Sequence, residues 1–432
     1  MSKQLWALGL IAVALSALVA VSTAGGARKA KGVSGKISVM AVWTGEEQKS
    51  FQAVLDGFKA ANPDVSVSYT SAGDQLPTVL ATAVAGGNPP DIAMLPQPGL
   101  MKQFVAKGAL KPISFVAPTM KANFAPVWQA LGTVNGKLYG LIWKGANKST
   151  VWYNVPAFKA AGVKAPKTWP QLLADAKTIK ASGATPYSIG GADGWTLTDL
   201  FENIYLRQAG PVKYDLLSTH KIKWTDPSVR AAFATMATII GNSGNIAGGT
   251  AGALQIDFPT SVSQVFTSPS KASMVFEGDF VGGVITSSTK AQPGTGFSVF
   301  AFPQIGKSGN VVVGGGDTAV MFKDSPAAEA LITYLAGPAA GTIWAHRGGF
   351  SSPNKKVPAA AYPDPISRAT ATALALAPVF RFDMSDLQPA SFGGTVGQGE
   401  FKLFQDFLAH PKNIKAVTAA FEAAAAKAYA GG

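Results

Sequence analysis

The chain of 432 residues contains no cysteine. This absence excludes a disulfide framework, thiolate metal sites, a cysteine nucleophile and a lipid-modified N-terminal cysteine. Charged residues are few, at 14%, against 47% hydrophobic residues. A composition this apolar excludes a disordered chain, and the 47 glycines and 28 prolines exclude a coiled coil. The length predicts two or three domains, or two lobes of one architecture.

Acidic residues are scarce. The chain has 24 Asp and Glu against 37 Lys and Arg, which gives a formal net charge of +13. Such a charge raises nucleic acid or an anionic surface as a partner. The basic residues are scattered singly, however, and their densest run is Arg28, Lys29 and Lys31. Because there is no basic stripe, the sequence predicts no nucleic-acid partner.

Only one uncharged apolar run is long enough to concern a membrane. It spans residues 5–21, follows Lys3 and is followed by small residues up to Ala24. This pattern predicts a secretory signal peptide over residues 1–26 and a flexible leader over 27–35. The alternative is an uncleaved membrane anchor. The chain is expected in the periplasm or outside the cell, and without cysteine it is not a lipoprotein.

The first hundred residues alternate between strand and helix patterns. Strands are expected at 36–43, 65–69 and 91–95, with helices after Thr44 and over 76–84. Thr44 with Glu47 three residues later matches a capping box. This β-α-β-α-β order predicts a parallel sheet with helices on both faces. Ligands bind beyond the carboxyl ends of such strands, where Trp43, Thr44 and Gln97 stand.

The middle of the chain, over 151–290, has a more helical pattern, and strand character returns at 297–302 and 311–313. We expect these late strands to belong to the first sheet, which predicts two lobes joined by more than one crossover. Residues 301–308 loosely match a phosphate-binding loop. Because another strand rather than a helix follows, the sequence predicts a hairpin tip there.

Catalytic patterns are rare. The three histidines have no partner at ligand spacing, so no metal site and no cofactor are predicted. Secreted glycosidases use two carboxylates, and three pairs leave that activity open. These pairs are Glu46/Glu47, Glu277/Asp279 and Asp383/Asp386.

Aromatic side chains next to polar turns are frequent among the nine tryptophans. A sugar presents apolar C–H faces and a rim of hydroxyls, so its site combines an aromatic ring with polar partners. Trp43, Trp143 and Trp195 are candidates because each is expected at the end of an element. Three others are assigned to the core: Trp169, Trp224 and Trp344.

With these motifs the chain resembles the extracellular solute-binding proteins of sugar ABC importers, the maltose-binding-like family. Motifs along the whole mature chain carry this resemblance: Phe58-Lys-Ala-Ala-Asn-Pro63, Gly86-Gly-Asn-Pro-Pro-Asp91, Gly108-Ala-Leu-Lys-Pro112, Val151-Trp-Tyr-Asn154, Pro166-Lys-Thr-Trp169 and Ser273-Met-Val-Phe-Glu-Gly-Asp-Phe280. A narrower likeness is to the branch that binds α-glucosides such as trehalose, maltose and sucrose. It rests on Gly194-Trp195-Thr-Leu-Thr-Asp199, Leu206-Arg-Gln-Ala-Gly-Pro211, Gly314-Gly-Gly-Asp317, Gly348-Gly-Phe-Ser-Ser-Pro-Asn354 and Phe380-Arg-Phe-Asp383.

The resemblance implies a periplasmic-binding-protein-like α/β fold. Its two lobes would each be a mainly parallel sheet flanked by helices, joined at a hinge by several crossovers. The first lobe would comprise residues 36–146 and 297–338, and the second 147–296 and 339–432. The protein would act as a monomer that closes over a sugar and docks on a membrane permease.

The resemblance also implies the ligand-binding residues. Phe280 would be a second aromatic platform where the family usually has tryptophan. The assigned residues are Trp43, Thr44, Glu46, Gln97 and Lys144 from the first lobe, with Trp195, Asp199, Asp279, Phe280, Asp317 and Asp383 completing the site.

Three alternatives remain open. The same fold could bind a polyamine, an oligopeptide or an anion instead of a sugar. A secreted glycosidase would use carboxylates such as Glu277 and Asp279. A cell-surface adhesin would keep its N-terminal segment as an anchor.

Overall fold

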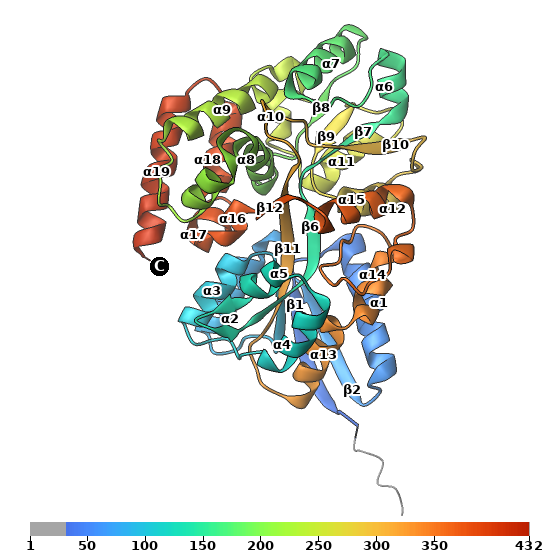
Figure 1. Cartoon of the computed structure of the whole chain (residues 1–432), viewed down its shortest axis with the longest axis vertical. Coiled ribbons are helices and arrows are strands. Elements are labelled where there is room, and N and C mark those ends of the chain that lie inside the picture. Colours follow the sequence, from blue (N-terminus) through green and yellow to red (C-terminus); the bar gives the residue numbers. More distant parts are fainter. Residues whose placement is uncertain (1–31, 432) are drawn as a thin grey trace, which may run out of the picture. The chain divides into compact units, whose positions relative to one another are not determined.

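The computed structural model describes residues 32–431, so the expected signal peptide and most of the expected leader lie outside the described residues. Within this described part, no helix is long and apolar enough to cross a membrane. Two sheets organise the chain, each with its own hydrophobic core (Figure 1). The expected two-lobe α/β fold is confirmed.

The first sheet has six strands. Five of them lie in the order β12-β11-β3-β1-β2, and the sixth, β6, lies outside this order and pairs with β11. Strand β1 is parallel to β2 and β3, whereas β11 is antiparallel to β3 and β6 and parallel to β12. The strand bounds are β1 Gly35–Ala41, β2 Val65–Ser71, β3 Ile92–Leu95, β6 Gly140–Asn147, β11 Val311–Met321 and β12 Val379–Phe382.

Helices cover both faces of this sheet because its strands alternate their side chains. Ile37 and Val39 of β1 pack with α1, α13 and α14, whereas Met40, the residue after Val39, packs against the core under α2 and α3. The bounds of these helices are α1 Gly45–Ala61, α2 Leu76–Ala85, α3 Pro98–Ala106, α13 Pro326–Ala336 and α14 Pro338–Ala345. The remaining elements before β6 are α4 Ala117–Asn123, α5 Pro126–Leu131, β4 Thr133–Val134 and β5 Lys137–Leu138.

The second sheet has four strands: β10 Phe297–Ala301, β7 Thr150–Asn154, β9 Met274–Phe276 and β8 Tyr187–Ser188, in that order. Only β8 and β9 are parallel, and the two other pairings are antiparallel. The expectation of a mainly parallel sheet is therefore wrong for this lobe. Strand β7 carries the chain away from the first sheet and β10 carries it back, so the two run in opposite directions.

Helices also enclose the second sheet, and several begin at side-chain caps. Thr168 and Gln171 form a capping box at the start of α7, and the Asp257 carboxylate accepts from the N–H of Thr260 at the start of α11. The bounds are α6 Val155–Ala161, α7 Trp169–Ala181, α8 Trp195–Ser218, α9 Pro227–Ile240, α10 Gly249–Ala253, α11 Phe258–Phe266, α12 Val281–Ser288, α16 Met384–Leu387, α17 Ala390–Gly393, α18 Gly399–Ala409 and α19 Ile414–Ala430. Helix α15 Pro365–Ala375 instead places Ala371 and Leu374 in the core of the first sheet, beside β6.

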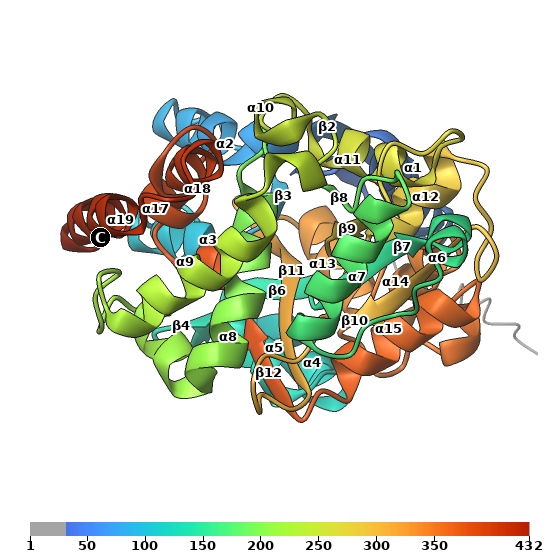
Figure 2. The same cartoon turned by 90° about the horizontal axis from the view of Figure 1, so that it is seen from above.

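Three chain segments connect the two lobes. Two of them join the sheets directly, from β6 to β7 and from β10 to β11, and the third runs from β12 of the first sheet to α16, which packs in the core of the second sheet. Figure 2 shows β6 and β11 passing side by side through the middle of the molecule. The expected hairpin tip at 301–308 is wrong, because β10 and β11 belong to different sheets. The segment is one of the three connections. The expectation that the strand at 297–302 belongs to the first sheet is wrong for the same reason, since β10 pairs with β7 of the second sheet. The lobe boundaries along the chain stay a prediction.

Candidate functional site

Strand β6 brings two lysines to the region between the sheets. All eight of its residues are buried, and Lys144 lies within it while Lys148 follows directly after it. Their separation of four residues places them on the same side of an extended chain, on the order of 13 Å apart. A buried ammonium requires carboxylates to compensate its lost hydration. Each lysine therefore forms the centre of an ionic group.

The first ionic group surrounds Lys144. Its Nζ lies 2.8 Å from Oε1 of Glu47 and 3.5 Å from Oδ2 of Asp317. The same Asp317 oxygen accepts a hydrogen bond of 2.8 Å from Nε1 of Trp43. Burial alone would lower the pKa of Lys144, but Glu47 and Asp317 raise it above the usual range. Burial raises the pKa of Asp317, against the effect of Lys144.

Trp43 is placed differently from its expected role as a sugar platform. Its side chain is 1% exposed and packs against Trp344, Phe51 and Trp143. The indole therefore offers no free face, and it acts on the site by holding Asp317. Trp143 is likewise buried inside β6, and the three tryptophans expected in the core are buried.

The start of α1 also differs from the expected capping box. Thr44 is the N-cap residue, but its exposed side chain makes no capping hydrogen bond. The expectation is wrong because Glu47 turns to Lys144 instead of to the helix end. Glu46 forms an exposed ion pair with Lys49 of the same helix. Of the acidic residues in this first turn, only Glu47 joins the ionic group.

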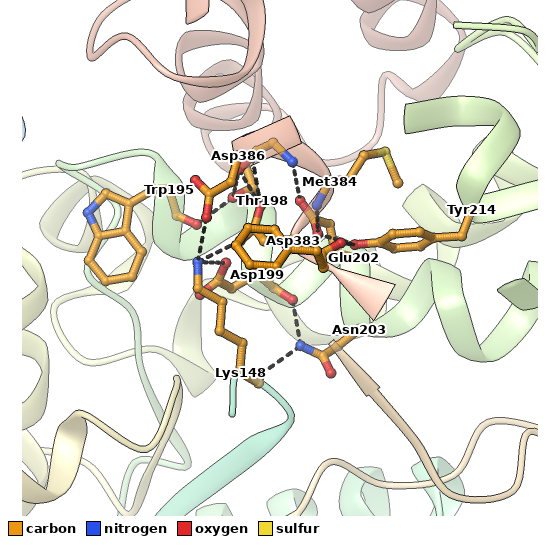
Figure 3. A network of polar contacts seen from close by, with 12 residues as sticks. Lys148, Trp195, Thr198, Asp199, Glu202, Asn203, Tyr214, Asp383, Met384 and Asp386 are labelled. Atoms are coloured by element: carbon orange, nitrogen blue, oxygen red, sulfur yellow. Dashed lines mark hydrogen bonds and ion pairs between the residues drawn. The ribbon is translucent and has the colours of Figure 1, made fainter. Parts of the chain in front are cut away.

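The second ionic group surrounds Lys148 (Figure 3). Its Nζ lies 2.5 Å from Oδ2 of Asp383, 3.0 Å from Oδ1 of Asp199 and 3.9 Å from Oδ2 of Asp386. Asp383 also accepts from the hydroxyl of Ser385 at 2.7 Å and from the N–H of Asp386 at 3.0 Å. Asp199 belongs to α8, so the group joins three separate parts of the chain.

The carboxyl groups around Lys148 have very different pKa values. Burial acts to raise the pKa of Asp383, but Lys148 and further hydrogen bonds prevail and lower it to about 2. Burial raises the pKa of Asp199 to about 8, against the attraction of Lys148. Burial also raises the pKa of Asp386 and of Glu277 well above their usual range. At neutral pH, Asp383 is therefore the ionised partner of Lys148.

Three half-buried aromatic rings lie against the lysines. The Trp195 and Phe280 ring centroids are 6.0 Å apart, and Phe258 lies 5.2 Å from each of them. Lys148 Nζ is 5.8 Å from the Trp195 ring, and Lys144 Nζ is 5.6 Å from the Phe280 ring. The aromatic trio is thus next to both ionic groups.

The other expected residues lie near these groups but make different contacts. Asp279 accepts from the hydroxyl of Ser351, and its burial raises its pKa to about 6. Gln97 is 5% exposed, and its Oε1 has no hydrogen-bond partner among the described residues. Asp199 Oδ2 and both carboxyl oxygens of Glu277 also lack hydrogen-bond partners within that part of the chain.

Side chains of helix α8 form hydrogen bonds to the backbone of the segments that connect the lobes. The amide of Asn203 donates to the carbonyl of Lys148 at 2.8 Å, and Arg207 donates to the carbonyl of Val311 at 2.9 Å. The Glu202 carboxylate accepts from the N–H groups of Met384 and Ser385, at 2.6 and 3.0 Å. One helix therefore fixes the start or end of all three connections between the sheets.

The structure brings seven of the eleven expected residues into the two ionic groups or the aromatic trio. These are Trp43, Lys144, Trp195, Asp199, Phe280, Asp317 and Asp383. Sequence reasoning missed Lys148, although a second lysine four residues after Lys144 was a usable signal. It considered Glu47 and Asp386 only as a helix cap or as members of possible glycosidase pairs, and it missed Phe258, because no local pattern distinguishes these residues as ligand-binding.

This region combines three half-buried aromatic rings with two fixed ammonium groups and several carboxyl groups. The fold and the site together define a two-lobe solute-binding protein. The chain matches the family model described as bacterial extracellular solute-binding protein over residues 43–342. The chain belongs to this family.

Two curated relatives cover most of the chain. The osmoprotective compounds-binding protein GgtB of Synechocystis is 33% identical over 373 residues, which cover 85% of this chain and 86% of that protein. The alpha-glucosides-binding periplasmic protein AglE of Rhizobium meliloti is 32% identical over 378 residues, which cover 84% of this chain and 81% of that protein.

Solved structures share the fold at lower identity. A chitin oligosaccharide binding protein is 22% identical with a TM-score of 0.79, covering 92% of this chain and 99% of that protein. The protein RafE in complex with raffinose is 18% identical with a TM-score of 0.73, and the match covers 90% of this chain and 100% of that protein.

Proposed function

We propose that this protein captures a neutral carbohydrate, an α-glucoside disaccharide, and delivers it without chemical conversion to the membrane permease of an ABC importer. One observation carries the proposal. Trp195 and Phe280 form a pair of half-buried rings, and each ring has a charge-compensated lysine beside it. Rings supply contact to the C–H faces of a sugar, while the neighbouring polar groups bind its hydroxyls.

The separation of the two ionic groups supports a ligand of two units. The lysines at the two ends of this region are on the order of 13 Å apart along extended backbone, and the aromatic trio contacts both. One unit would contact Glu47 and Asp317, and the other Asp199 and Asp386. One of the two curated relatives is named for osmoprotective compounds and the other for α-glucosides, and the second name supports an α-glucoside as the ligand.

We further propose that the ligand favours a closed arrangement of the lobes, because only then do residues from both lobes contact it. The residues assigned to this contact are Thr44, Glu46, Gln97 and Asp279, together with Trp195 and Phe280 of the aromatic trio and the residues of the two ionic groups. The protein would act in the periplasm or after secretion, as a monomer exported by its N-terminal segment.

Thermal unfolding of the full chain against trehalose, maltose, sucrose, glucose and a polyamine tests the proposal. A ligand at about a thousand times its Kd adds roughly 4 kcal/mol and raises Tm by several degrees. A shift with one α-glucoside supports the proposal. The absence of a shift with every sugar contradicts it, and turnover of an aryl glucoside would contradict a purely binding role.

A cationic solute is the second candidate, because acidic residues border the aromatic trio. Asp193 accepts from the N–H of Phe258 at 2.6 Å, and burial raises its pKa to about 7. Asp74 and Asp257 act on it electrostatically, and none of the three pairs with a cationic side chain in residues 32–431. A Tm shift with the polyamine alone would favour this candidate.

A further inference from the structure

The surface around α6 and α7 is rich in lysine and poor in acidic residues. Over residues 155–192 the chain has five lysines and a single acidic residue, Asp175. All five lysines are exposed, while Asp175 is half-buried. Figure 1 shows α6 and α7 at the end of the second lobe that is remote from β1 and β2. The lysines are Lys159, Lys164, Lys167, Lys177 and Lys180.

A sixth lysine joins this surface from the connection between β10 and β11. The N–H of Trp169 donates to the carbonyl of Gln304 at 2.8 Å, and the N–H of Gln304 donates to the carbonyl of Lys167 at 2.9 Å. These bonds hold the connection against the start of α7, and the exposed Lys307 lies three residues after Gln304. We call the six lysines the basic surface.

Some lysines on the exterior of the described chain form ion pairs. Lys49 pairs with Glu46, Lys213 with Asp226, and Lys402 with Asp406. None of the six has an ion-pair partner in the part of the chain that the structure describes. Uncompensated like charges repel one another, so this surface is built at a cost to stability.

Acidic residues are concentrated at the candidate site, and all but the exposed Asp74 and Asp257 of those found there are buried or half-buried, so the rest of the exterior is more basic than the net charge indicates. Ten of the 24 acidic residues belong to the candidate site or border it. Among the basic residues of the described part, 32–431, only Lys144 and Lys148 form ion pairs with them. The ten acidic residues are Glu47, Asp74, Asp193, Asp199, Asp257, Glu277, Asp279, Asp317, Asp383 and Asp386.

The chemistry of the basic surface fits phosphate groups better than a protein partner. Protein interfaces are anchored by large apolar or aromatic residues. The exposed large hydrophobic residues of the described chain all lie outside 155–192 and 302–310: Val79, Phe115, Val127, Val212 and Leu376. Lysine ammonium groups act as point charges toward phosphates, and each contributes to binding at an anionic membrane surface.

We propose that the basic surface of α6, α7 and the β10–β11 connection holds the protein at a membrane that contains anionic phospholipids. The contact is electrostatic and leaves the candidate site free, because it involves the remote end of the second lobe. Retention near the membrane raises the local concentration of the protein at its permease. It also accounts for the basic charge, which a neutral ligand does not require.

Sedimentation of the full chain with vesicles tests this proposal. Vesicles of phosphatidylcholine alone are compared with vesicles containing phosphatidylglycerol, at 20 and 200 mM salt. The wild type is expected to bind only the anionic vesicles, and less at high salt. The variant with Lys164→Glu, Lys177→Glu and Lys180→Glu is expected to bind at least tenfold more weakly. The same three lysines changed to Gln serve as a second variant with less repulsion.

A matched control changes the charge by the same amount elsewhere in the second lobe. Lys412→Glu, Lys415→Glu and Lys427→Glu alter three exposed lysines on and before α19, outside the basic surface. The affinity of this control variant for the anionic vesicles is expected to fall less than threefold. Equal loss in both variants would overturn the proposal in favour of net charge alone. Binding only to vesicles that carry the permease would overturn it in favour of a protein partner, as would no binding to anionic vesicles.

Discussion

The ammonium group of Lys148 lies 2.5 Å from the carboxylate of Asp383, whose side chain has no exposed surface. Lys148 stands in the connection from β6 to β7, and Asp383 stands between β12 and α16. The ion pair therefore joins two of the three segments that connect the lobes. Asp199 binds the same ammonium from α8. The residues that we expect at the ligand are thus also those that tie the connections together.

Replacing Lys148 by Met is expected to destabilise the fold by about 3–5 kcal/mol, because it leaves a buried carboxylate without its counter-ion. Urea unfolding measures this change. Lys213→Met is the control, since Lys213 forms an exposed ion pair with Asp226, and it is expected to cost less than about 1 kcal/mol. Similar losses in both variants would show that Lys148 contributes no more than a surface charge.

Stability is expected to fall as the pH rises from about 4 to 8. Burial raises the pKa of Asp199 from 3.8 to about 8, so between these values the folded state keeps a proton that the unfolded state has lost. One such carboxyl group lowers the unfolding free energy by up to about 1.4 kcal/mol per pH unit in this window. Asp383 acts oppositely: its lowered pKa stabilises the fold above its ordinary value, and this contribution is lost toward pH 2.

The variant Asp199→Asn isolates the first of these effects. It removes the titrating group, so the decline between pH 4 and 8 becomes shallower in urea unfolding measured at several pH values. Asp226→Asn is the control, because the pKa of this half-buried carboxyl group is lowered by Ser228. An unchanged slope in Asp199→Asn would contradict the raised pKa.

Gly99 marks a close approach between the lobes. A Cβ atom at this position, near the start of α3, would lie 2.1 Å from the backbone oxygen of Gln388 and 3.0 Å from that of Asp386. Gly99→Ala is therefore expected to destabilise the fold by about 1–3 kcal/mol through forced backbone shifts. Gly86→Ala, whose Cβ atom would meet nothing closer than 3.4 Å, is the control. Equal Tm values for both variants would contradict this contact.

Trp195→Ala is expected to weaken binding of the sugar identified by thermal unfolding at least tenfold. The half-buried indole packs against Phe258 and Phe280, and its removal deletes the largest ring of the trio. Isothermal titration calorimetry measures the change, and Trp195→Phe should restore part of the affinity. Full affinity in the alanine variant would show that the sugar does not contact this ring.

Local sequence patterns predicted much of the first lobe. The strands β1, β2 and β3 and the helices between them lie within a few residues of their expected positions. The apolar alternation of β1 and the helical spacing of Phe51, Val54 and Phe58 are properties of neighbouring residues, so they can be read without the fold. The direction of the strands in the second sheet could not be read this way, because it depends on which connection each strand serves.

The sequence by itself determined the α/β composition, the family, and the chemical types available to the site: tryptophan at element ends, lysine in an apolar strand and carboxylates after turns. The tertiary structure alone decided which of these groups meet. Asp199 and Asp383 are distant in sequence, and they share one ammonium because three connections converge on α8. Trp43 is buried in the core, whereas Trp195 is half-buried. Which indole keeps an accessible face depends on the elements packed around it, and no local sequence pattern encodes that packing.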